Sequence, residues 1–342
     1  MTEQDGKPFD PVDNLIRAVA DVICGIILEN GSDTTNPDLN RLLKLTADHI
    51  ADADNNQVVA ILDFFPLAHY LPLKAYDRFL QPFDEIHCII RKLLRERKET
   101  FDPKEPVEDF MSALLRAEHD FQAEYEENEE KAAHVSEDHF VVSIHDMFLA
   151  GYETTTTALR FIISFLASHP KYQEDIQHQL EEVVGNQRPS LDDRRNLPLV
   201  QATILEALRV GNTAPLAVPH VTTTDTTLCG YRVPKGTIVF ANIESVHLNP
   251  KCWEDPTVFN PYRHIDTDGK LVTNQGNFYP FGAGRRVCAG EALAKVELFL
   301  FVSRLLHAFT FVPEEGHPPK VKSAVLQFPD RYTVRAIKRS RK

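Results

Sequence analysis

Apolar residues recur at helical spacing in the first third of the chain. One stretch contains Leu15, Val19, Val22, Ile23, Ile26 and Ile27, and a second contains Ile86, Ile89, Ile90, Leu93 and Leu94. Side chains three and four positions apart lie on the same face of an α-helix. Both stretches therefore predict amphipathic helices that bury one face.

A longer helix is predicted to begin at Ser136. A serine N-cap accepts a hydrogen bond from the first turn, and Glu137 and Asp138 place negative charge at the positive end of the helix dipole. The apolar pattern continues until Pro170, which ends the helix. Shorter helices are predicted over 171–184, 199–210 and 291–308.

Two segments break this helical pattern. Between residues 118 and 138 nine residues are acidic and one is Lys, which predicts an exposed loop. Residues 216–222 and 226–243 are rich in Val, Ile, Thr, Tyr and Phe, with turns at Gly230 and at 234–236. These predict a small sheet, so the expected fold class is mainly α with a small β region.

Composition narrows the possible functions. The chain has 342 residues, with 37 Lys and Arg against 50 Asp and Glu, a net charge of −13. Because phosphate binding needs clustered cations, we expect no nucleic-acid partner. The five cysteines are widely spaced and form no C-x-x-C pair, which argues against a disulfide scaffold or a zinc ribbon. The polar start and the absence of a long apolar run predict no signal peptide and no membrane anchor in the chain as given.

The most specific chemical pattern is Phe-Gly-Ala-Gly-Arg-Arg-Val-Cys-Ala-Gly, which runs from Phe281 to Gly290. It brings Cys288 to a predicted helix start beside an arginine, where the thiolate form is favoured. Gly284 and Gly290 allow the backbone to approach a flat ligand. Phe281 can pack beside the sulfur, and Arg286 can pair with an anionic group on the ligand. A cysteine is more often a buried structural residue, but these surroundings favour an axial heme ligand.

The same ten residues fit F-x-x-G-x-R-x-C-x-G at every specified position, and the chain therefore resembles the cytochrome P450 family. The resemblance implies a single cytochrome P450 domain over residues 1–342. It also implies heme b (iron protoporphyrin IX) held by the Cys288 thiolate, whose electron donation favours cleavage of the O–O bond of dioxygen.

A second segment, Ala-Gly-Tyr-Glu-Thr-Thr from Ala150, resembles the oxygen-activation stretch of that family, (A/G)-G-x-(D/E)-T-(T/S). Gly151 would let a ligand approach the helix, and Thr154 is expected to bond back to the Ala150 carbonyl and open the helix locally. Taken alone, a Glu and a Thr inside a helix usually form a solvated face. The resemblance implies instead that Glu153 and Thr154 steer protons during catalysis.

Glu206 and Arg209 form an E-x-x-R pattern like the one that this family carries on a helix. Spacing of three places both side chains on one face, although such pairs are common on protein surfaces. In the family an arginine from a later loop joins them, and Arg263 stands in that place. Tyr262 and His264 replace the usual Glu and Phe of that loop. We expect a buried network that supports the fold.

His220 resembles the family position that meets a heme propionate, and Arg286 is expected to pair with a propionate as well. The alternative for His220 is a surface histidine at a strand edge. The stretches that begin at Asp146 and Pro280 resemble microsomal members, in the branch that holds steroid 17α-hydroxylase and the aryl-hydrocarbon-oxidising enzymes. Full-length members begin with a membrane helix and early helices, so we expect an N-terminally truncated chain with exposed apolar surface.

The resemblance implies a heme-thiolate monooxygenase that inserts one oxygen atom from O2 into a lipophilic substrate, with steroids as the expected class. Electrons would come from NADPH through NADPH-cytochrome P450 reductase, with cytochrome b5 as a further partner, at the endoplasmic reticulum membrane. Two alternatives stay open. One is a non-catalytic fragment that does not bind heme productively. The other is a same-fold isomerase or dehydratase, which the intact Glu153–Thr154 pair disfavours.

Overall fold

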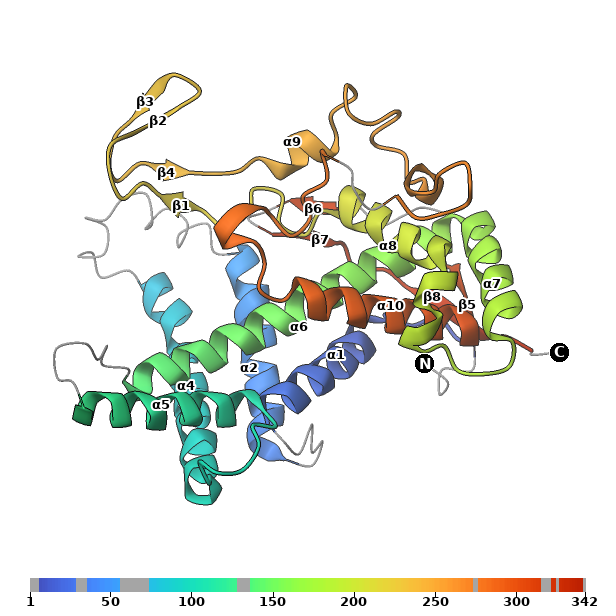
Figure 1. Cartoon of the computed structure of the whole chain (residues 1–342). Helices are drawn as coiled ribbons and strands as arrows, with labels where there is room; N and C mark the ends of the chain where they lie inside the picture. The colour runs from blue at the N-terminus through green and yellow to red at the C-terminus, as the bar shows by residue number, and fades with distance from the viewer. Residues whose placement is uncertain are drawn as a thin grey trace. The chain divides into compact units, whose positions relative to one another are not determined.

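The computed structural model describes residues 6–28, 36–55, 74–127, 136–272, 276–314, 321–323 and 326–340 (Figure 1). The chain divides into two compact units, one formed by Ile16–Glu153 and the other by Met1–Leu15 together with Thr154–Lys342. Helix α6 (Glu137–Ser168) contributes to both units. Helices predominate and the strands are short, which confirms the predicted fold class.

The unit Ile16–Glu153 is built from helices. They are α1 (Val12–Ile27), α2 (Pro37–Asn55), α4 (Lys74–Thr100), α5 (Phe110–Glu127) and the first half of α6. Val19 and Ile23 of α1 and Ile86 and Ile90 of α4 are almost completely buried. The two apolar stripes expected from the sequence therefore face the core, and the predicted amphipathic helices are confirmed.

The acidic segment differs from its prediction. Residues 118–127 were expected in an exposed loop, but they form the second half of α5, while residues 128–135 lie outside the described residues. Met111 and Leu115 anchor the helix in the core. Lys98 of α4 pairs with Glu118 at 3.0 Å. Glu and Ala both have high helix propensity. A high content of acidic residues therefore does not distinguish an exposed helix from an exposed loop.

The second unit holds the other predicted helices, α7 (Pro170–Val184), α8 (Pro198–Gly211) and α10 (Glu291–Ala308), each within one residue of its expected bounds. Helix α7 ends at Gly185, whose φ of +61° is accessible to glycine. Helix α8 packs closely on α6, because a Cβ added to Gly211 would lie 2.7 Å from Phe161 Cγ. This contact requires glycine at the end of α8.

The predicted small sheet is two separate antiparallel pairs. Strand β1 (His220–Val221) pairs with β4 (Ile238–Val239), and β2 (Thr226–Leu228) pairs with β3 (Tyr231–Val233). The turns at Gly230 and Gly236 are confirmed by their positive φ angles of +84° and +83°. The strand prediction is wrong for 216–219, which Pro219 interrupts, and for 240–243, where Asn242 caps the short helix α9 (Ile243–His247).

Two further strand pairs lie near the C-terminus and were not predicted. Strand β5 (Phe309–Pro313) pairs with β8 (Val334–Lys338), and β6 (Val321–Ser323) pairs with β7 (Gln327–Pro329). Phe9 joins the edge of β8, since the backbone amides and carbonyls of Phe9 and Val334 exchange two hydrogen bonds of 3.0 Å. The start of the chain therefore belongs to the same unit as its end.

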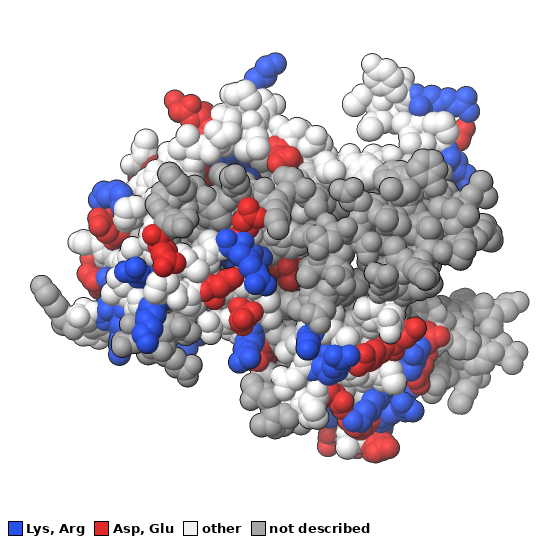
Figure 2. All heavy atoms as spheres, turned by 180° about the vertical axis from the view of Figure 1, so that it is seen from behind, with Lys and Arg blue, Asp and Glu red and all other residues white. Residues whose placement is uncertain are grey.

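The surface carries charges of both signs. Lysines and arginines intermingle with aspartates and glutamates over the face that Figure 2 shows. Several apolar side chains of the β1–β4 and β2–β3 pairs are exposed, with Tyr231 at 78% and Val218, just before β1, at 70%. Among the described helices, none combines the length and apolar character that crossing a membrane requires.

Candidate functional site

The segment around Cys288 is a tight loop that leads into α10. A short 3-10 helix (Gly284–Arg286) precedes the cysteine, and the Cys288 amide donates to the Phe281 carbonyl at 2.9 Å. Gly282 and Gly284 have φ angles of +76° and +77°, which glycine adopts without strain. A Cβ at either glycine would meet nothing within 4 Å, so backbone conformation rather than crowding requires glycine there.

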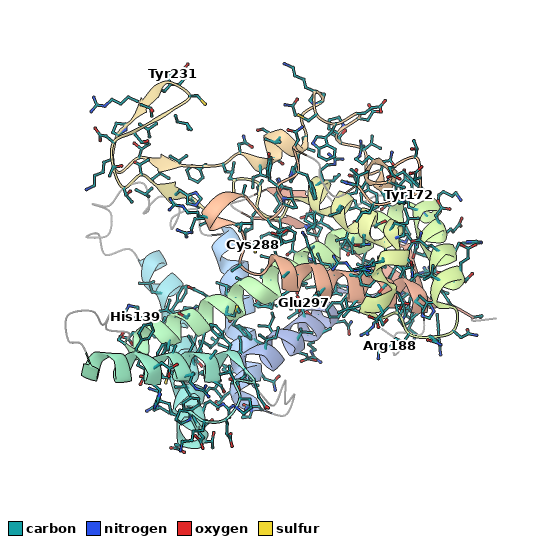
Figure 3. The ribbon with its side chains drawn as sticks, viewed as in Figure 1. His139, Tyr172, Arg188, Tyr231, Cys288 and Glu297 are labelled. Atoms are coloured by element: carbon teal, nitrogen blue, oxygen red, sulfur yellow. The ribbon has the colours of Figure 1, made fainter. Side chains whose placement is uncertain are left out.

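The thiol of Cys288 lies open on this loop (Figure 3). It is exposed and forms no disulfide. A Cβ added to Gly290 would lie 3.9 Å from its Sγ, an ordinary contact distance, so Gly290 flanks the sulfur without crowding it. Phe281 is half-buried, and its ring centre lies 5.6 Å from the Lys295 ammonium. The cysteine is thus accessible to a ligand, as an axial heme ligand must be.

The two residues that the sequence assigned to propionates lie on different elements, Arg286 in the Cys288 loop and His220 in β1. Arg286 is exposed in the 3-10 helix, and His220 is exposed in β1, where its backbone pairs with Val239. Among the described residues neither side chain forms an ion pair. An open thiol with unpaired basic side chains is a donor set that suits heme b, which needs a sulfur for iron and cations for its carboxylates. The described contacts do not bring Cys288, Arg286 and His220 together.

The segment from Ala150 lies within α6, which is α-helical without interruption from Glu137 to Ser168. The local opening expected at Thr154 is therefore absent from this backbone. Gly151 packs against α1, because a Cβ added to it would lie 2.5 Å from Ile23 Cδ1. Helix packing thus accounts for this glycine, a role that the sequence analysis did not predict.

The two candidate proton-transfer residues are accessible to different degrees. Glu153 is half-buried and Thr154 is exposed, as is Ala150 one turn earlier. Thr154 is the first of four consecutive threonines, and the other three are buried. Glu153 and Thr154 are adjacent in the chain, and carboxylate and hydroxyl groups are types that can transfer protons.

One buried acidic residue was missed. Glu297, in the middle of α10, is 5% exposed and accepts a hydrogen bond from Thr155 Oγ1 at 3.3 Å. Burial raises the pKa of Glu297 to about 7, although the bond from Thr155 lowers it in part. Its Oε1 has no hydrogen-bond partner among the described residues. No sequence signal indicated this contact, because Glu297 and Thr155 are 142 positions apart.

The predicted charge network is confirmed. Glu206 receives two hydrogen bonds from Arg209, of 2.9 and 2.8 Å, and one of 2.9 Å from Arg263 Nε. Glu206 and Arg209 are completely buried. Arg209 also donates to the carbonyls of His247 and Pro256, both at 2.7 Å. The network therefore ties α8 to the long loop that follows α9.

His264 is a fourth member of this network that the sequence analysis did not foresee. Its Nε2 lies 2.9 Å from Glu206 Oε2, and both side chains are completely buried. Burial by itself would raise the pKa of Glu206, but hydrogen bonds from Arg209 and His264 outweigh it and lower the pKa to about 2. The sequence did contain one signal for this contact, because His264 is polar at a position where the family usually has Phe.

Comparisons with known proteins extend over most of the chain. A family model described as "Cytochrome P450" matches residues 1–336. The chain is 34% identical over 317 residues to cytochrome P450 2U1 of Rattus norvegicus. The aligned region covers 92% of this chain and 58% of that protein. It is 37% identical over 344 residues to steroid 17-alpha-hydroxylase/17,20 lyase of Oryzias latipes, covering 98% of this chain and 65% of the relative.

A third relative, cytochrome P450 1A1 of Oryzias latipes, is 33% identical over 321 residues, or 93% of this chain and 60% of the relative. The chain thus spans 58–65% of the length of these curated relatives.

Proposed function

The chain belongs to the cytochrome P450 family, and we propose that it carries the heme-binding part of a heme-thiolate monooxygenase that inserts one oxygen atom from dioxygen into a lipophilic substrate. The observation that carries the proposal is the exposed, unbonded Cys288 on a loop whose shape is set by two positive-φ glycines and the Cys288 to Phe281 backbone bond. We also propose that the two compact units belong to one domain over residues 1–342.

Heme b would be held by side chains of the Cys288 loop and of β1. The Cys288 sulfur would ligate the iron, and Arg286 and His220 would pair with the carboxylates. Phe281, Gly284 and Gly290 would flank the ring near the sulfur. When bound, heme b supplies the redox chemistry that cleaves dioxygen, and a thiolate ligand favours that cleavage.

Proton movement is assigned to α6. The Thr154 hydroxyl, exposed on the helix, would hold a proton at Oγ1 and pass it toward the reacting oxygen. The Glu153 carboxylate, adjacent in the chain, would resupply that hydroxyl from solvent. Ala150, which is exposed, and Gly151 lie just before this pair on the same helix and would contact the bound ligand.

The proposed substrate class is lipophilic, with steroids as the first class to test. One match supports it: the chain is 37% identical, over 98% of its length, to a protein named steroid 17-alpha-hydroxylase/17,20 lyase. NADPH-cytochrome P450 reductase is the proposed electron donor, cytochrome b5 a further partner and the endoplasmic reticulum membrane the proposed location, all by analogy with the family.

Heme stoichiometry tests the proposal. We expect the purified chain to take up one heme per chain, and Cys288→Ala to abolish thiolate-type ligation because the proposed iron ligand is removed. Cys252→Ala is the matched control, since Cys252 is an exposed cysteine of the same unit and should be dispensable. Unchanged heme ligation in Cys288→Ala would reject the assignment, and absence of heme uptake by the wild-type chain would favour a non-catalytic fragment.

A further inference from the structure

A buried acid lies on the helix that follows the candidate heme ligand. Glu297 is nine positions after Cys288, and its neighbours Leu298 and Phe299 are almost completely buried. Figure 3 labels Glu297 on α10 and Cys288 on the loop before that helix. No ion pair among the described residues involves Glu297. The proposed heme site assigns no role to this carboxyl group.

The surroundings of Glu297 favour the neutral acid. Ionising a buried carboxyl group without a cation is costly, and Glu206 shows the contrast because two arginines and a histidine surround it. Burial raises the pKa of Glu297, the Thr155 bond alone opposes it, and no charged group contributes to the shift. A neutral carboxyl can accept the Thr155 hydrogen bond at Oε2 and keep its proton at Oε1, the atom without a partner among the described residues.

The contact joins two elements that the proposed function uses. Thr155 directly follows Thr154 on α6, and α10 begins at Glu291, three positions after Cys288. Thr155 is buried while Thr154 is exposed. Because neighbouring residues of a helix are about 100° apart around its axis, holding the Thr155 hydroxyl fixes the direction in which Thr154 projects.

We propose that Glu297, as a neutral carboxylic acid, is a positioning residue that holds Thr155 and thereby fixes Thr154 relative to the helix that carries the Cys288 loop. This inference rests on the proposed function for its catalytic meaning. The bond itself and its effect on α6 can be measured without heme. Glu297 therefore acts through Thr155, whereas Thr154 is the residue that meets the reacting atoms.

The charge state is tested by infrared spectroscopy of the chain without heme. At a pH below the pKa of Glu297, we expect the wild-type spectrum to contain the C=O band of a buried, protonated carboxylic acid. This band should shift in D2O and should be absent from the spectrum of Glu297→Gln. A spectrum of the wild-type chain that does not differ from that of Glu297→Gln in this band would overturn the neutral assignment.

The positioning effect is tested by amide hydrogen exchange of α6. Thr155→Val and Glu297→Leu each remove the hydrogen bond between these two side chains. We expect the backbone amides of Thr154 and Thr155 to exchange about fivefold faster in both variants. This factor corresponds to the ~1 kcal/mol that one neutral hydrogen bond contributes. Glu297→Gln keeps an acceptor and should exchange like the wild type. Thr156→Val is the matched control, because Thr156 is equally buried and its hydroxyl has no partner among the described residues.

Acceleration in Thr156→Val equal to that in Thr155→Val, or none in Glu297→Leu, would contradict the proposal. In the heme-loaded chain with reductase, Thr155→Val and Glu297→Leu should divert more electrons to hydrogen peroxide at unchanged heme content, with Glu297→Gln near the wild type. Unchanged peroxide yield in both variants would overturn the link to Thr154. Absence of heme uptake would instead contradict the proposed function and leave the exchange result to decide this inference.

Discussion

Glu206 and Glu297 are both buried glutamates of the same unit, and their surroundings shift their pKa values in opposite directions. Glu206 faces Arg209, Arg263 and His264, whereas Glu297 has the hydroxyl of Thr155 as its hydrogen-bond partner within the described part of the chain. Buried charges persist where several donors surround them and are neutralised where they are alone. The two residues therefore respond to pH in different ranges.

The Glu206 network predicts a loss of stability in acid. Its folded pKa of about 2 lies below the ordinary value of 4.5, so the stabilisation is complete above about pH 4.5 and is lost as pH falls toward 2. A shift of that size corresponds to about 3 kcal/mol. We expect the unfolding free energy of the wild-type chain to fall between pH 5 and pH 3 by part of this amount, about 1–2 kcal/mol, measured by denaturant titration.

Glu206→Gln should lack this acid-dependent component and be less stable at neutral pH, because two arginines lose their buried counter-charge. Glu181→Gln provides the matched control, since Glu181 pairs with Arg339 while its side chain is 61% exposed. Surface pairs contribute little, so this control should keep the wild-type pH slope. An equal pH slope in Glu206→Gln and the wild type would contradict the assignment.

Close helix contacts depend on glycines at particular positions. Gly151 lets α6 approach Ile23 of α1 in one unit, and Gly211 lets α8 approach Phe161 of α6 in the other. A Cβ at either position would come within 3.0 Å of a carbon atom. These glycines set helix spacing, and in α6 that spacing lies one turn from the candidate proton-transfer residues.

Gly151→Ala should destabilise the chain. Alanine gains about 1 kcal/mol of helix propensity, but overpacking against the buried Ile23 costs about 1–3 kcal/mol. We expect a net loss near 1 kcal/mol in thermal or denaturant unfolding. Ile23→Val removes the Cδ1 atom and should cost less stability in the Gly151→Ala background than in the wild-type chain. A double-mutant cycle with no coupling would show that the contact does not limit packing.

The spacing of apolar residues predicted which segments are helical. It predicted where helices and strands end only where a capping residue or a helix breaker was present. Helix α6 ends at Ser168, shortly before Pro170 as expected, and α7 ends at Val184, before Gly185. The acidic half of α5 was missed because solvated glutamates suit a helix as well as a loop. The β5–β8 pair joins segments separated by residues 314–333, which local pattern does not reveal. The β6–β7 pair is local, but its strands have three residues each, too few to show a repeating pattern.

The candidate site could be predicted where the sequence holds a compact motif. The Cys288 loop and the Glu206–Arg209 pair are local, and Arg263 followed from the family pattern. Glu297 could not be predicted, because its partner is reached only through tertiary packing. Motifs therefore identified the candidate ligand and the fold support, and the structure identified the buried acid on α10.

At the scale of the whole molecule, we propose that this chain forms a heme-thiolate site. The chain spans 58–65% of the curated relatives it matches, and its Cys288 loop is complete. Under the proposed function, heme uptake would require the Cys288 thiol, and the exposed His220 and Arg286 would pair with the heme carboxylates.

The most direct test is the absorption spectrum of the purified, heme-supplemented chain, reduced and exposed to carbon monoxide. We expect a strongly red-shifted Soret band, which marks thiolate ligation, and its loss in Cys288→Ala. A band typical of histidine ligation, or no heme band, would contradict the claim that this chain forms a heme-thiolate site.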